Sequence, residues 1–444
     1  MKDNRQLIRE IAQEAHALGG RALLVGGCVR DELMSVPCYD IDCEIYGVEK
    51  QALREMLSRF GRIDESGEAY GIFTLEGCGL DIALPRLETR TGQGHRDFTV
   101  TVDPFLSPKR AAARRDFTVN AIMRDALTGE IIDPYGGVQD LENGVLRAVP
   151  GGQFEEDPLR VLRGAQFAAR FHLAPDEKTM QSMRRMPLDS LSAPRVASEM
   201  KKALLTSDQP DVFFRVLLEA DALHAWFPEL EALTRAPQNP VYHPEGDSFE
   251  HTMLVLREAA VLRDRSADPL AFMLAALVHD LGKAVSTKKN DKGAWQAIGH
   301  EYTGLPLIET MLARLGFSKA VIAYAKDMCR LHMRVHTCYY QKARVSRTNV
   351  LFDASCCPQE LMNLVVCDAR GTGKPREQAD AEEAFIGERL DAYCLAASRP
   401  MPTAKMLLAA GAEPGPQLGA ALRKARELVL SGETLERAID QAVK

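Results

Sequence analysis

The sequence predicts an α+β chain in which a small mixed α/β head precedes a long all-helical remainder. Up to about residue 135, short strand patterns alternate with helical patterns. From about residue 157 to the end, almost every segment has a helical period. The length of 444 residues favours roughly two to four domains.

The head is expected to begin with an amphipathic helix that closes at Gly19-Gly20. The strands that follow are predicted at residues 21–25, 40–46, 71–75 and 79–84. Residues 85–113 carry mixed charge without a clear period, so we expect a mobile loop, and residues 235–247 are typical of an interdomain linker. The expected domains are a head (1–138), a helical neck and body (139–235), a further helical domain (236–375) and a helical tail (376–444).

The composition excludes several classes of protein. A formal net charge of −7 argues against a protein that coats nucleic acid indiscriminately. No segment has the ~18–20 uninterrupted apolar residues that a membrane span needs, and the N-terminus has no signal-peptide core. The ten cysteines form no CxxC pair and are typical of small buried side chains. We therefore expect a cytoplasmic protein with no membrane partner, and the sequence leaves its oligomeric state open.

Residues 25–34, VGGCVRDELM, predict a strand that turns directly into a helix. Gly26 and Gly27 allow backbone N–H groups to approach a phosphate closely, and a helix N-terminus favours negative charge. Arg30 lies in the first helical turn, where it could reach a triphosphate. A pair of glycines alone fits an ordinary strand–turn–helix equally well.

The next strand carries Asp40 and Asp42, one residue apart, so that both carboxylates point to the same side. Two carboxylates this close repel each other unless a cation lies between them. A pair of Mg²⁺ ions would supply that cation and hold a triphosphate and an attacking hydroxyl in line. Asp81, on a later strand, could complete the metal site or accept the proton of the hydroxyl.

These blocks resemble the head of the polymerase-β-like superfamily, specifically the bacterial, class II CCA-adding enzymes and poly(A) polymerases. GGCVRD followed by DID is matched by further blocks in the family's order. They are RRDFTVNAI (114–122), DPYGGVQDLENGVLRAV (133–149), EDPLRVLRGAQFAARF (156–171) and SAPRVASEMKKAL (192–204). The resemblance implies that Arg115 contacts the triphosphate or ribose and that Asp116 and Asn120 organise the sugar.

Asp157 and Arg160 offer an account of base choice, because residues three apart at a helix start share a face. A carboxylate only accepts hydrogen bonds and a guanidinium only donates them, which matches the pairing edges of C and A and opposes those of U and G. A helix cap with an ion pair would fit the same spacing. The resemblance favours base selection, with Arg163 on phosphate; where many members carry a further Arg, this chain has Gln166.

The resemblance also bears on which nucleotides are added. The long loop at 85–113 follows the third carboxylate, as in members that add the full CCA, and favours these over CC-only enzymes. Poly(A) polymerases of this class usually carry paired basic residues with Phe between the metal strands, whereas this chain has GEAYGIFTLE at 67–76.

A second constellation combines His251, the adjacent His279 and Asp280 in VHDLGK, and Asp368. Imidazoles and carboxylates suit a divalent metal, and separate helices of a bundle could bring the four together. The set resembles the HD phosphohydrolase superfamily, with His300 and His332 as possible further ligands. That resemblance implies a divalent metal (Mg, Mn, Ni or another) and phosphodiesterase or phosphatase action on nucleotide 2′ or 3′ ends.

We therefore expect an enzyme that adds CMP, CMP and AMP from CTP and ATP to the tRNA 3′ end, with an appended HD hydrolase. The alternatives are a poly(A) polymerase or A-adding enzyme, and a chain whose primary activity is the HD hydrolase. A non-catalytic RNA-binding protein would be expected to show a strongly basic surface or interleaved aromatics.

Overall fold

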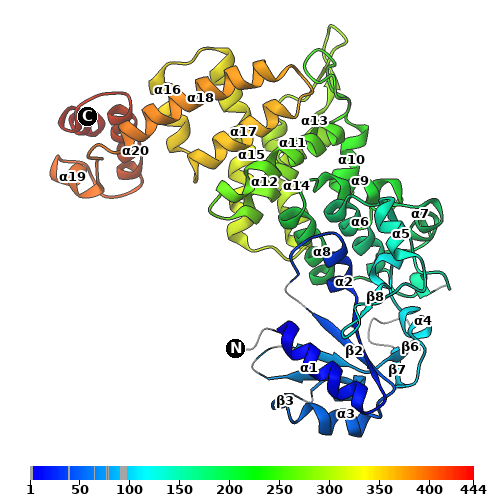
Figure 1. Cartoon of the computed structure of the whole chain (residues 1–444). Helices are drawn as coiled ribbons and strands as arrows, with labels where there is room; N and C mark the ends of the chain where they lie inside the picture. Colours follow the sequence, from blue (N-terminus) through cyan, green and yellow to red (C-terminus); the bar gives the residue numbers. More distant parts are fainter. Residues whose placement is uncertain are drawn as a thin grey trace. The chain divides into compact units, whose positions relative to one another are not determined.

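The computed structural model describes residues 4–38, 41–64, 66–76, 78, 80–90, 98–151 and 153–444. The chain forms two compact units. The first holds Met1–Leu191 with Glu219–Ala222, and the second holds Ser192–Leu218 with Leu223–Lys444. The first unit is mixed α/β and the second is almost entirely helical (Figure 1), which confirms the predicted fold class.

A mixed seven-stranded sheet forms the centre of the first unit, in the order β3-β4-β5-β2-β1-β8-β9. β2 pairs antiparallel with β1 and parallel with β5. The strands are β1 Arg21–Val25, β2 Asp42–Tyr46, β3 Ile63–Asp64, β4 Ile72–Leu75, β5 Leu80–Ala83, β8 Met123–Asp125 and β9 Ile131–Ile132. The four predicted strands of the head thus appear as β1, β2, β4 and β5.

The helices of the first unit surround this sheet and extend beyond it. They are α1 Asn4–Ala17, α2 Gly27–Leu33, α3 Lys50–Leu57, α4 Pro108–Ala112, α5 Gly137–Glu142, α6 Leu159–Phe171 and α7 Glu177–Arg184. Short 3₁₀ turns are η1 Glu68–Tyr70, η2 Thr118–Asn120 and η3 Gln153–Glu156, and two-residue strands β10 Val145–Leu146 and β11 Ala174–Pro175 pair in parallel.

Strand alternation sets the two faces of the sheet. Cys43 and Ile45 of β2 pack into one core with Ile11 of α1 and Leu53 of α3, so these helices cover that face (Figure 1). Leu23 and Val25 of β1, with Tyr46 of β2, belong to a second core that contains residues of α4 and β8. Asp42 and Glu44 share the parity of Tyr46, so they lie on the face opposite α1 and α3.

Residues 85–113 contain more regular structure than the predicted mobile loop. β6 Arg86–Arg90 pairs antiparallel with β7 Phe98–Val102, and α4 follows. The run FTVTV is rich in β-branched residues, and this strand propensity outweighs the mixed charge on which the loop prediction relied. Residues 91–97 lie outside the described residues.

The second unit is a stack of helices. They are α8 Ala193–Thr206, α9 Asp211–Glu219, α10 Pro228–Ala232, α11 Ser248–Leu262, α12 Pro269–Val278, α13 Lys283–Ser286, α14 His300–Arg314, α15 Lys319–Tyr340, α16 Val345–Asp353, α17 Pro358–Arg370, α18 Arg376–Ala397, α19 Ala404–Ala409, α20 Pro416–Leu430 and α21 Leu435–Val443. The 3₁₀ turns η4 Leu233–Arg235 and η5 Arg263–Arg265 and a small hairpin of β12 Lys288–Lys289 with β13 Trp295–Gln296 complete it.

Residues 235–247, predicted to be an interdomain linker, lie inside the second unit. The segment is closed at its base, where Pro237 and Asp247 form a β-bridge and Ser248 donates both N–H and Oγ–H to the carbonyl of Ala236. Its Pro and Gly residues therefore belong to a tight loop that precedes α11, and they do not mark a boundary between the two units.

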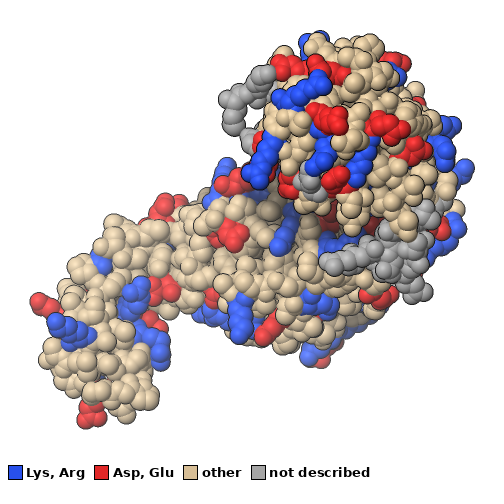
Figure 2. Space-filling view, turned by 90° about the horizontal axis from the view of Figure 1, so that it is seen from below, with Lys and Arg blue, Asp and Glu red and all other residues tan. Residues whose placement is uncertain are grey.

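Among the described residues, one helical window, Pro269–Ser286, has the length and apolarity of a membrane span, and 72% of it is buried inside the structure. The pair of helices Val345–Asp353 and Pro358–Arg370, bent by 108°, passes the same test only if the two count as one span. The core helix of a water-soluble protein has the same character. In the view of Figure 2, Lys and Arg side chains are interspersed with Asp and Glu, in keeping with the modest net charge.

Candidate active sites

The first candidate site begins with two carboxylates on neighbouring parallel strands. Asp42 opens β2, and its register partner on β5 is Asp81. Register partners on adjacent strands point to the same face, and the strands lie about 4.8 Å apart. Both side chains are exposed, and Thr74 of β4 donates its hydroxyl to Asp81 Oδ1 at 2.6 Å. Two oxygen ligands side by side suit a hard divalent cation.

Gly26 provides space beside Asp42. It follows β1 with φ of +72°, a conformation that favours glycine. A Cβ at Gly26 would stand 3.2 Å from Arg115 Nη1 and 3.6 Å from Asp42 Oδ2. The glycine therefore keeps open a cradle with a guanidinium and a carboxylate at its edge, which suits a metal-bound phosphate.

Glu44 is a buried carboxylate that the sequence analysis missed. Its Oε1 accepts from Arg114 Nη2 at 2.8 Å and Arg115 Nη2 at 3.2 Å, and Tyr46 donates its hydroxyl to Oε2 at 2.7 Å. Burial alone would raise the pKa of Glu44, but the charges of Arg115 and Arg114 outweigh it and hold the pKa below its ordinary value. Glu44 thus anchors both arginines beside the strand that carries Asp42.

Asp116 and Asn120 form a buried pair, since Asn120 Nδ2 donates to Asp116 Oδ1 at 2.8 Å. Arg163 of α6 donates Nε to the other oxygen of Asp116 at 2.7 Å. Burial opposes ionisation of Asp116, but Arg163 and the hydrogen bond from Asn120 lower its pKa below the ordinary value. This carboxylate therefore ties α6 to η2, which holds Asn120.

Arg30 was predicted to reach a triphosphate, but its side chain is buried and its guanidinium contacts other protein groups. Its Nη1 donates to Asn120 Oδ1 at 2.5 Å, and Nε and Nη2 donate to Asp31 Oδ1 at 2.9 and 2.5 Å. Its guanidinium carbon also lies 4.1 Å from the centre of the Phe171 ring of α6. This geometry favours a structural link between α2 and α6, and a contact with triphosphate stays a prediction.

Asp157 and Arg160 lie together at the start of α6. Asp157 Oδ1 accepts from Leu159 N at 3.0 Å, which is a cap-like contact. Arg160 donates Nη1 to the carbonyl of Gln153 at 2.8 Å and Nη2 to that of Arg114 at 2.7 Å. Both side chains are half-buried and anchored by the backbone, an arrangement that could present fixed acceptor and donor atoms to a base.

Gln166, where many members of the resembled family carry an arginine, faces inward. It is buried, and its Nε2 has no hydrogen-bond partner within the described part of the chain. Arg163, one turn earlier, lies 5.0 Å over the ring of Phe167 and contacts Asp116 as described above.

The second candidate site lies wholly within the second unit. His251 comes from α11, His279 and Asp280 follow α12, and Asp368 is on α17. His251 Nε2 lies 2.9 Å from Asp368 Oδ1 and 3.5 Å from Asp280 Oδ2. His279 Nε2 lies 3.2 Å from the same oxygen of Asp280. The structure therefore brings the four predicted ligands together.

His300 and His332 lie on the other side of Asp280. Their Nε2 atoms stand 3.0 and 3.7 Å from Asp280 Oδ1 and 3.3 Å from each other. Asp280 thus presents one oxygen to His251 and His279 and the other to His300 and His332. Each group of three residues has its ligand atoms close enough to hold one metal ion.

Gly282 explains how His300 reaches this cluster. A Cβ at Gly282 would fall 2.0 Å from the carbonyl oxygen of His300 and 2.6 Å from Gly304 N. The backbone at Gly282 is therefore in direct contact with the backbone of α14. The glycine of the HDLGK block therefore lets the first turn of α14 approach Asp280.

Three of these histidines are oriented so that their Nε2 atoms can bind a metal. His279, His300 and His332 direct Nδ1 at backbone carbonyls of Ala276, Ala297 and Cys329, at 2.8, 2.7 and 2.6 Å. A proton on Nδ1 leaves the Nε2 lone pair free to bind a cation. Burial lowers the pKa of His332 to about 4, so this ring is neutral at physiological pH, as a ligand must be.

Polar atoms at the centre of the cluster indicate that a cation fits it. Within the described residues, His279 Nε2 and both oxygens of Asp280 make no hydrogen bond of good geometry, although all are buried. Lys283 Nζ lies 2.6 Å from Asp280 Oδ2 at ion-pair distance. Buried carboxylate oxygens and imidazole nitrogens without hydrogen bonds are the atoms that a divalent ion satisfies.

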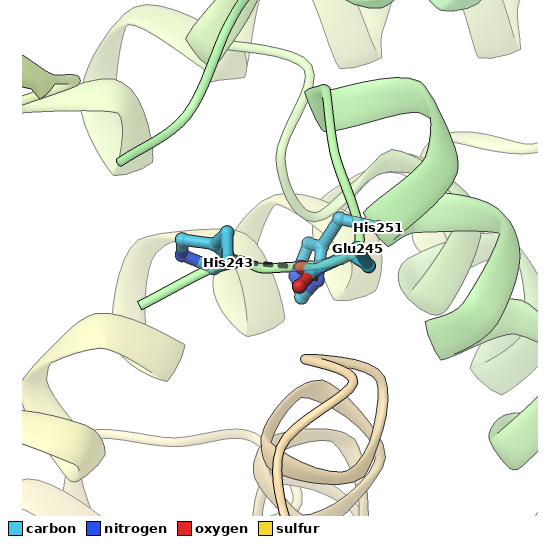
Figure 3. Close-up of side chains that lie close together, drawn as sticks. All are labelled: His243, Glu245 and His251. Atoms are coloured by element: carbon cyan, nitrogen blue, oxygen red, sulfur yellow. Dashed lines mark hydrogen bonds and ion pairs between the residues drawn. The ribbon is translucent and has the colours of Figure 1, made fainter. Parts of the chain in front are cut away.

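Four residues around this cluster were missed by sequence reasoning. His336 Nε2 lies 2.8 Å from Asp368 Oδ2, and its Nδ1 lies 2.7 Å from Glu382 Oε1. On the opposite side, His243 and Glu245 contact His251 (Figure 3). The periodicity of α15 could have placed His336 one turn after His332, but nothing in the sequence indicated the other three.

The structure thus assembles each set of predicted residues that it describes. Gly26, Asp42, Asp81 and Arg115 lie together at one end of the central strands β1, β2 and β5, while Asp40 lies outside the described residues. Gly27 opens α2 directly after Gly26. The catalytic and binding roles of these residues stay predictions.

Three family models match the chain. They are the poly A polymerase head domain over residues 22–147, the probable RNA and SrmB-binding site of polymerase A over 172–234, and the HD domain over 248–369. The nucleotidyltransferase and HD domains imply the use of divalent metal ions.

Solved structures of CCA-adding enzymes share the fold. An apo form has a TM-score of 0.67 at 20% identity, covering 99% of this chain and 95% of the other. The Thermotoga maritima enzyme complexed with tRNA(CCA) has a TM-score of 0.65 at 19% identity, covering 98% and 94%. The Bacillus stearothermophilus enzyme in complex with CTP has a TM-score of 0.63 at 20% identity, covering 99% and 98%.

Sequence relatives are closer. The multifunctional CCA protein of Xanthomonas oryzae pv. oryzae is 37% identical over 415 residues, which cover 91% of this chain and 96% of the relative. That of Stenotrophomonas maltophilia strain K279a is 37% identical over 418 residues, covering 91% and 97%. At this identity and coverage the chain belongs to the multifunctional CCA protein family, a family of CCA-adding nucleotidyltransferases, and it carries an HD domain.

Proposed function

We propose that this chain adds CMP, CMP and AMP from CTP and ATP to the 3′ end of tRNA. The observation that carries the proposal is the parallel register of Asp42 with Asp81, next to the cradle kept open by Gly26 and Arg115. The family membership supports the same activity, as do the tRNA and CTP that the similar solved structures contain.

Asp42, with Asp40, would hold Mg²⁺, and Asp81 would complete the metal site or accept the proton of the 3′-hydroxyl. Bound Mg²⁺ supplies charge neutralisation to the triphosphate and lowers the pKa of the attacking hydroxyl. Thr74 fixes one oxygen of Asp81 by its hydrogen bond, so the carboxylate is oriented before substrate arrives.

Arg115 would bind the triphosphate, and Glu44 positions it together with Arg114. Asp116 and Asn120 would organise the nucleotide sugar. Arg30 acts through Asn120 in this account, since its guanidinium already donates to that side chain.

Asp157 and Arg160 would select the base. Arg160 is held by two backbone carbonyls, which fix the plane of its guanidinium, and Asp157 is held by a backbone N–H. A fixed acceptor beside a fixed donor fits the pairing edges of C and A. Arg163 would contact phosphate while it holds Asp116.

The test is extension of a tRNA that lacks its 3′ CCA, with Mg²⁺ and with CTP, ATP or both, followed by sizing of the products. We expect two nucleotides with CTP alone and three with both. Homopolymeric A tails would replace the proposal with a poly(A) polymerase, and no extension under any condition would overturn it.

We also propose that the HD domain hydrolyses phosphate esters at nucleotide 2′ or 3′ ends, using a divalent metal such as Mg, Mn or Ni. The observation that favours this second activity is the buried group of Asp280 and His279 atoms that lack hydrogen bonds. In this role the chain would trim damaged tRNA ends before extension.

Hydrolysis of a nucleoside 2′,3′-cyclic phosphate tests the HD activity, with Mg²⁺, Mn²⁺ and Ni²⁺ supplied in turn. Asp280→Asn should abolish it and leave tRNA extension intact. Hydrolysis that persists in Asp280→Asn would assign it to another site. For the chain as a whole we propose a cytoplasmic location and domains at 1–138, 139–235, 236–375 and 376–444.

A further inference from the structure

One histidine of the HD cluster has a carboxylate close to its Nδ1 in addition to a backbone carbonyl. His279, His300 and His332 each direct Nδ1 at a neutral backbone carbonyl three residues earlier. His251 Nδ1 also hydrogen-bonds a backbone carbonyl, that of Gly371 at 3.3 Å, but in addition the carboxylate of Glu245 lies beside it at 2.9 Å, an ion-pair distance. The imidazole that faces Asp368 is therefore backed by a second carboxylate.

Glu245 is itself held in place. Its Oε1 lies 2.8 Å from His243 Nδ1 as well as 2.9 Å from His251 Nδ1, so one oxygen is shared by two rings (Figure 3). The Glu245 side chain is 4% exposed, and the ring centres of His243 and His251 lie 4.9 Å apart at 78°. The loop that precedes α11 therefore delivers a buried, oriented carboxylate to the outer side of His251.

We propose that Glu245, fixed by His243, is the positioning carboxylate of His251 and makes the metal position at His251 the tighter of two positions that share Asp280. The inference rests on the proposed metal function of the HD cluster. The tighter position would use His251, His279, Asp280 and Asp368, and the weaker one Asp280, His300 and His332.

The physical reason is charge. A carboxylate that accepts the Nδ1 proton makes the opposite nitrogen a stronger donor to a metal, and loss of such an outer partner costs about 10–100-fold in metal affinity. The position at His251 has Glu245 as well as the Gly371 carbonyl behind the ring, and Asp368 beside it. His300 and His332 direct Nδ1 at neutral carbonyls, and Glu301 Oε2 lies farther from His300 Nδ1, at 3.9 Å. Asp280 serves both positions, and Lys283 pairs with its Oδ2 on the His251 side, so the two carboxylates of Glu245 and Asp368 stand against one ammonium there.

The three side chains in Figure 3 could alternatively hold an ion of their own, since their ligand atoms lie close together. That arrangement would require His251 to give Nδ1 to one ion and Nε2 to another, which strips both ring protons. With a proton kept on Nδ1, His251 contacts both the Gly371 carbonyl and the Glu245 carboxylate without such a loss, so the positioning role is favoured.

The test is calorimetric titration of the metal-free full chain with Mn²⁺. Every sample carries Asp42→Asn so that the transferase site does not contribute. We expect two ions per chain in this background. Glu245→Ala should weaken the tighter ion by about 10–100-fold and leave the weaker one unchanged. Glu245→Gln, which keeps an acceptor for Nδ1–H but loses the charge, should fall between.

Two further variants separate positioning from general damage. His300→Ala should remove the weaker ion and spare the tighter one, a selectivity that a merely structural defect would not reproduce. Glu250→Ala is the matched control, because Glu250 adjoins His251 on α11 but pairs with Arg215, and it should leave both ions unchanged. If Glu245→Ala does not fold, His243→Asn should weaken the same ion by a smaller factor.

The outcomes distinguish a failure of the proposed metal function from a failure of the positioning role of Glu245. No bound ion in the background chain would overturn the proposed metal function itself. Two ions with unchanged affinities in Glu245→Ala, Glu245→Gln and His243→Asn would overturn the positioning role alone. A third ion that disappears in Glu245→Ala and His243→Asn would make these residues direct ligands, and this too would overturn the inference.

Discussion

Removal of the negative charge from Glu44 should damage both stability and nucleotide binding. In Glu44→Gln, the guanidinium groups of Arg114 and Arg115 lose the buried carboxylate that they share at 2.8 and 3.2 Å. Removal of one partner from a buried ion pair costs about 3–5 kcal/mol. The two arginine side chains are 13% and 21% exposed, and water screens part of the loss, so we expect about 3 kcal/mol.

Urea denaturation at pH 7 measures the stability, and steady-state extension kinetics measure the function. Because Arg115 would lose its anchor, KM for CTP and ATP should rise more than kcat falls. The control is Glu130→Gln, which removes an exposed carboxylate that pairs with Arg21 and should cost at most about 1 kcal/mol. A Glu44→Gln chain as stable as the control, with unchanged KM, would refute the anchoring role.

The pKa of Glu44 gives this prediction a pH dependence. The folded-state pKa lies below the ordinary value of 4.5, so the ionised form stabilises the fold. That contribution is fully present above pH 4.5, declines as the pH falls below it, and is lost once the pH passes the lowered folded pKa. The stability difference between wild type and Glu44→Gln should therefore be constant above pH 4.5 and shrink in denaturation experiments as the pH falls below it.

Three other variants test separate parts of the account. Gly282→Ala would place a methyl group against the carbonyl of His300 and should destabilise the chain by about 3 kcal/mol in urea denaturation; a loss below ~1 kcal/mol would contradict the close approach. Asp157→Ala should lower discrimination against UTP by at least about tenfold in single-nucleotide extension, and unchanged discrimination would contradict base selection. Asp280→Asn should lower Mn²⁺ binding in the Asp42→Asn background, and full binding would exclude it as a ligand.

The fold of the head could be predicted well because its strands are short and clearly bounded. Residues 21–25 are bounded by glycines on both sides, and the strand in the structure has the same limits. The adjacency of Asp42 and Asp81 could not be read from periodicity, because it depends on β5 pairing directly and in parallel with β2, although α3, β3 and β4 lie between the two strands in the chain.

The missed site residues share a physical reason. In the sequence alone, Glu44 has the pattern of a solvent-facing residue on a half-exposed strand. Only the structure, in which Arg114 and Arg115 pack against it, shows that Glu44 is buried and paired. His243 and Glu245 lie in a segment whose Pro and Gly content indicated a linker, and their function depends on a contact with His251 that no local pattern encodes.

The most direct test of the central claim is single-turnover extension of tRNA lacking its CCA by wild-type chain and by Asp42→Asn, with cyclic phosphate hydrolysis measured on the same samples. We predict three added nucleotides for wild type with CTP and ATP, at least about a thousandfold slower extension for Asp42→Asn, and equal hydrolysis by both. Extension by Asp42→Asn at the wild-type rate would contradict the assignment of nucleotidyl transfer to the Asp42 and Asp81 strands.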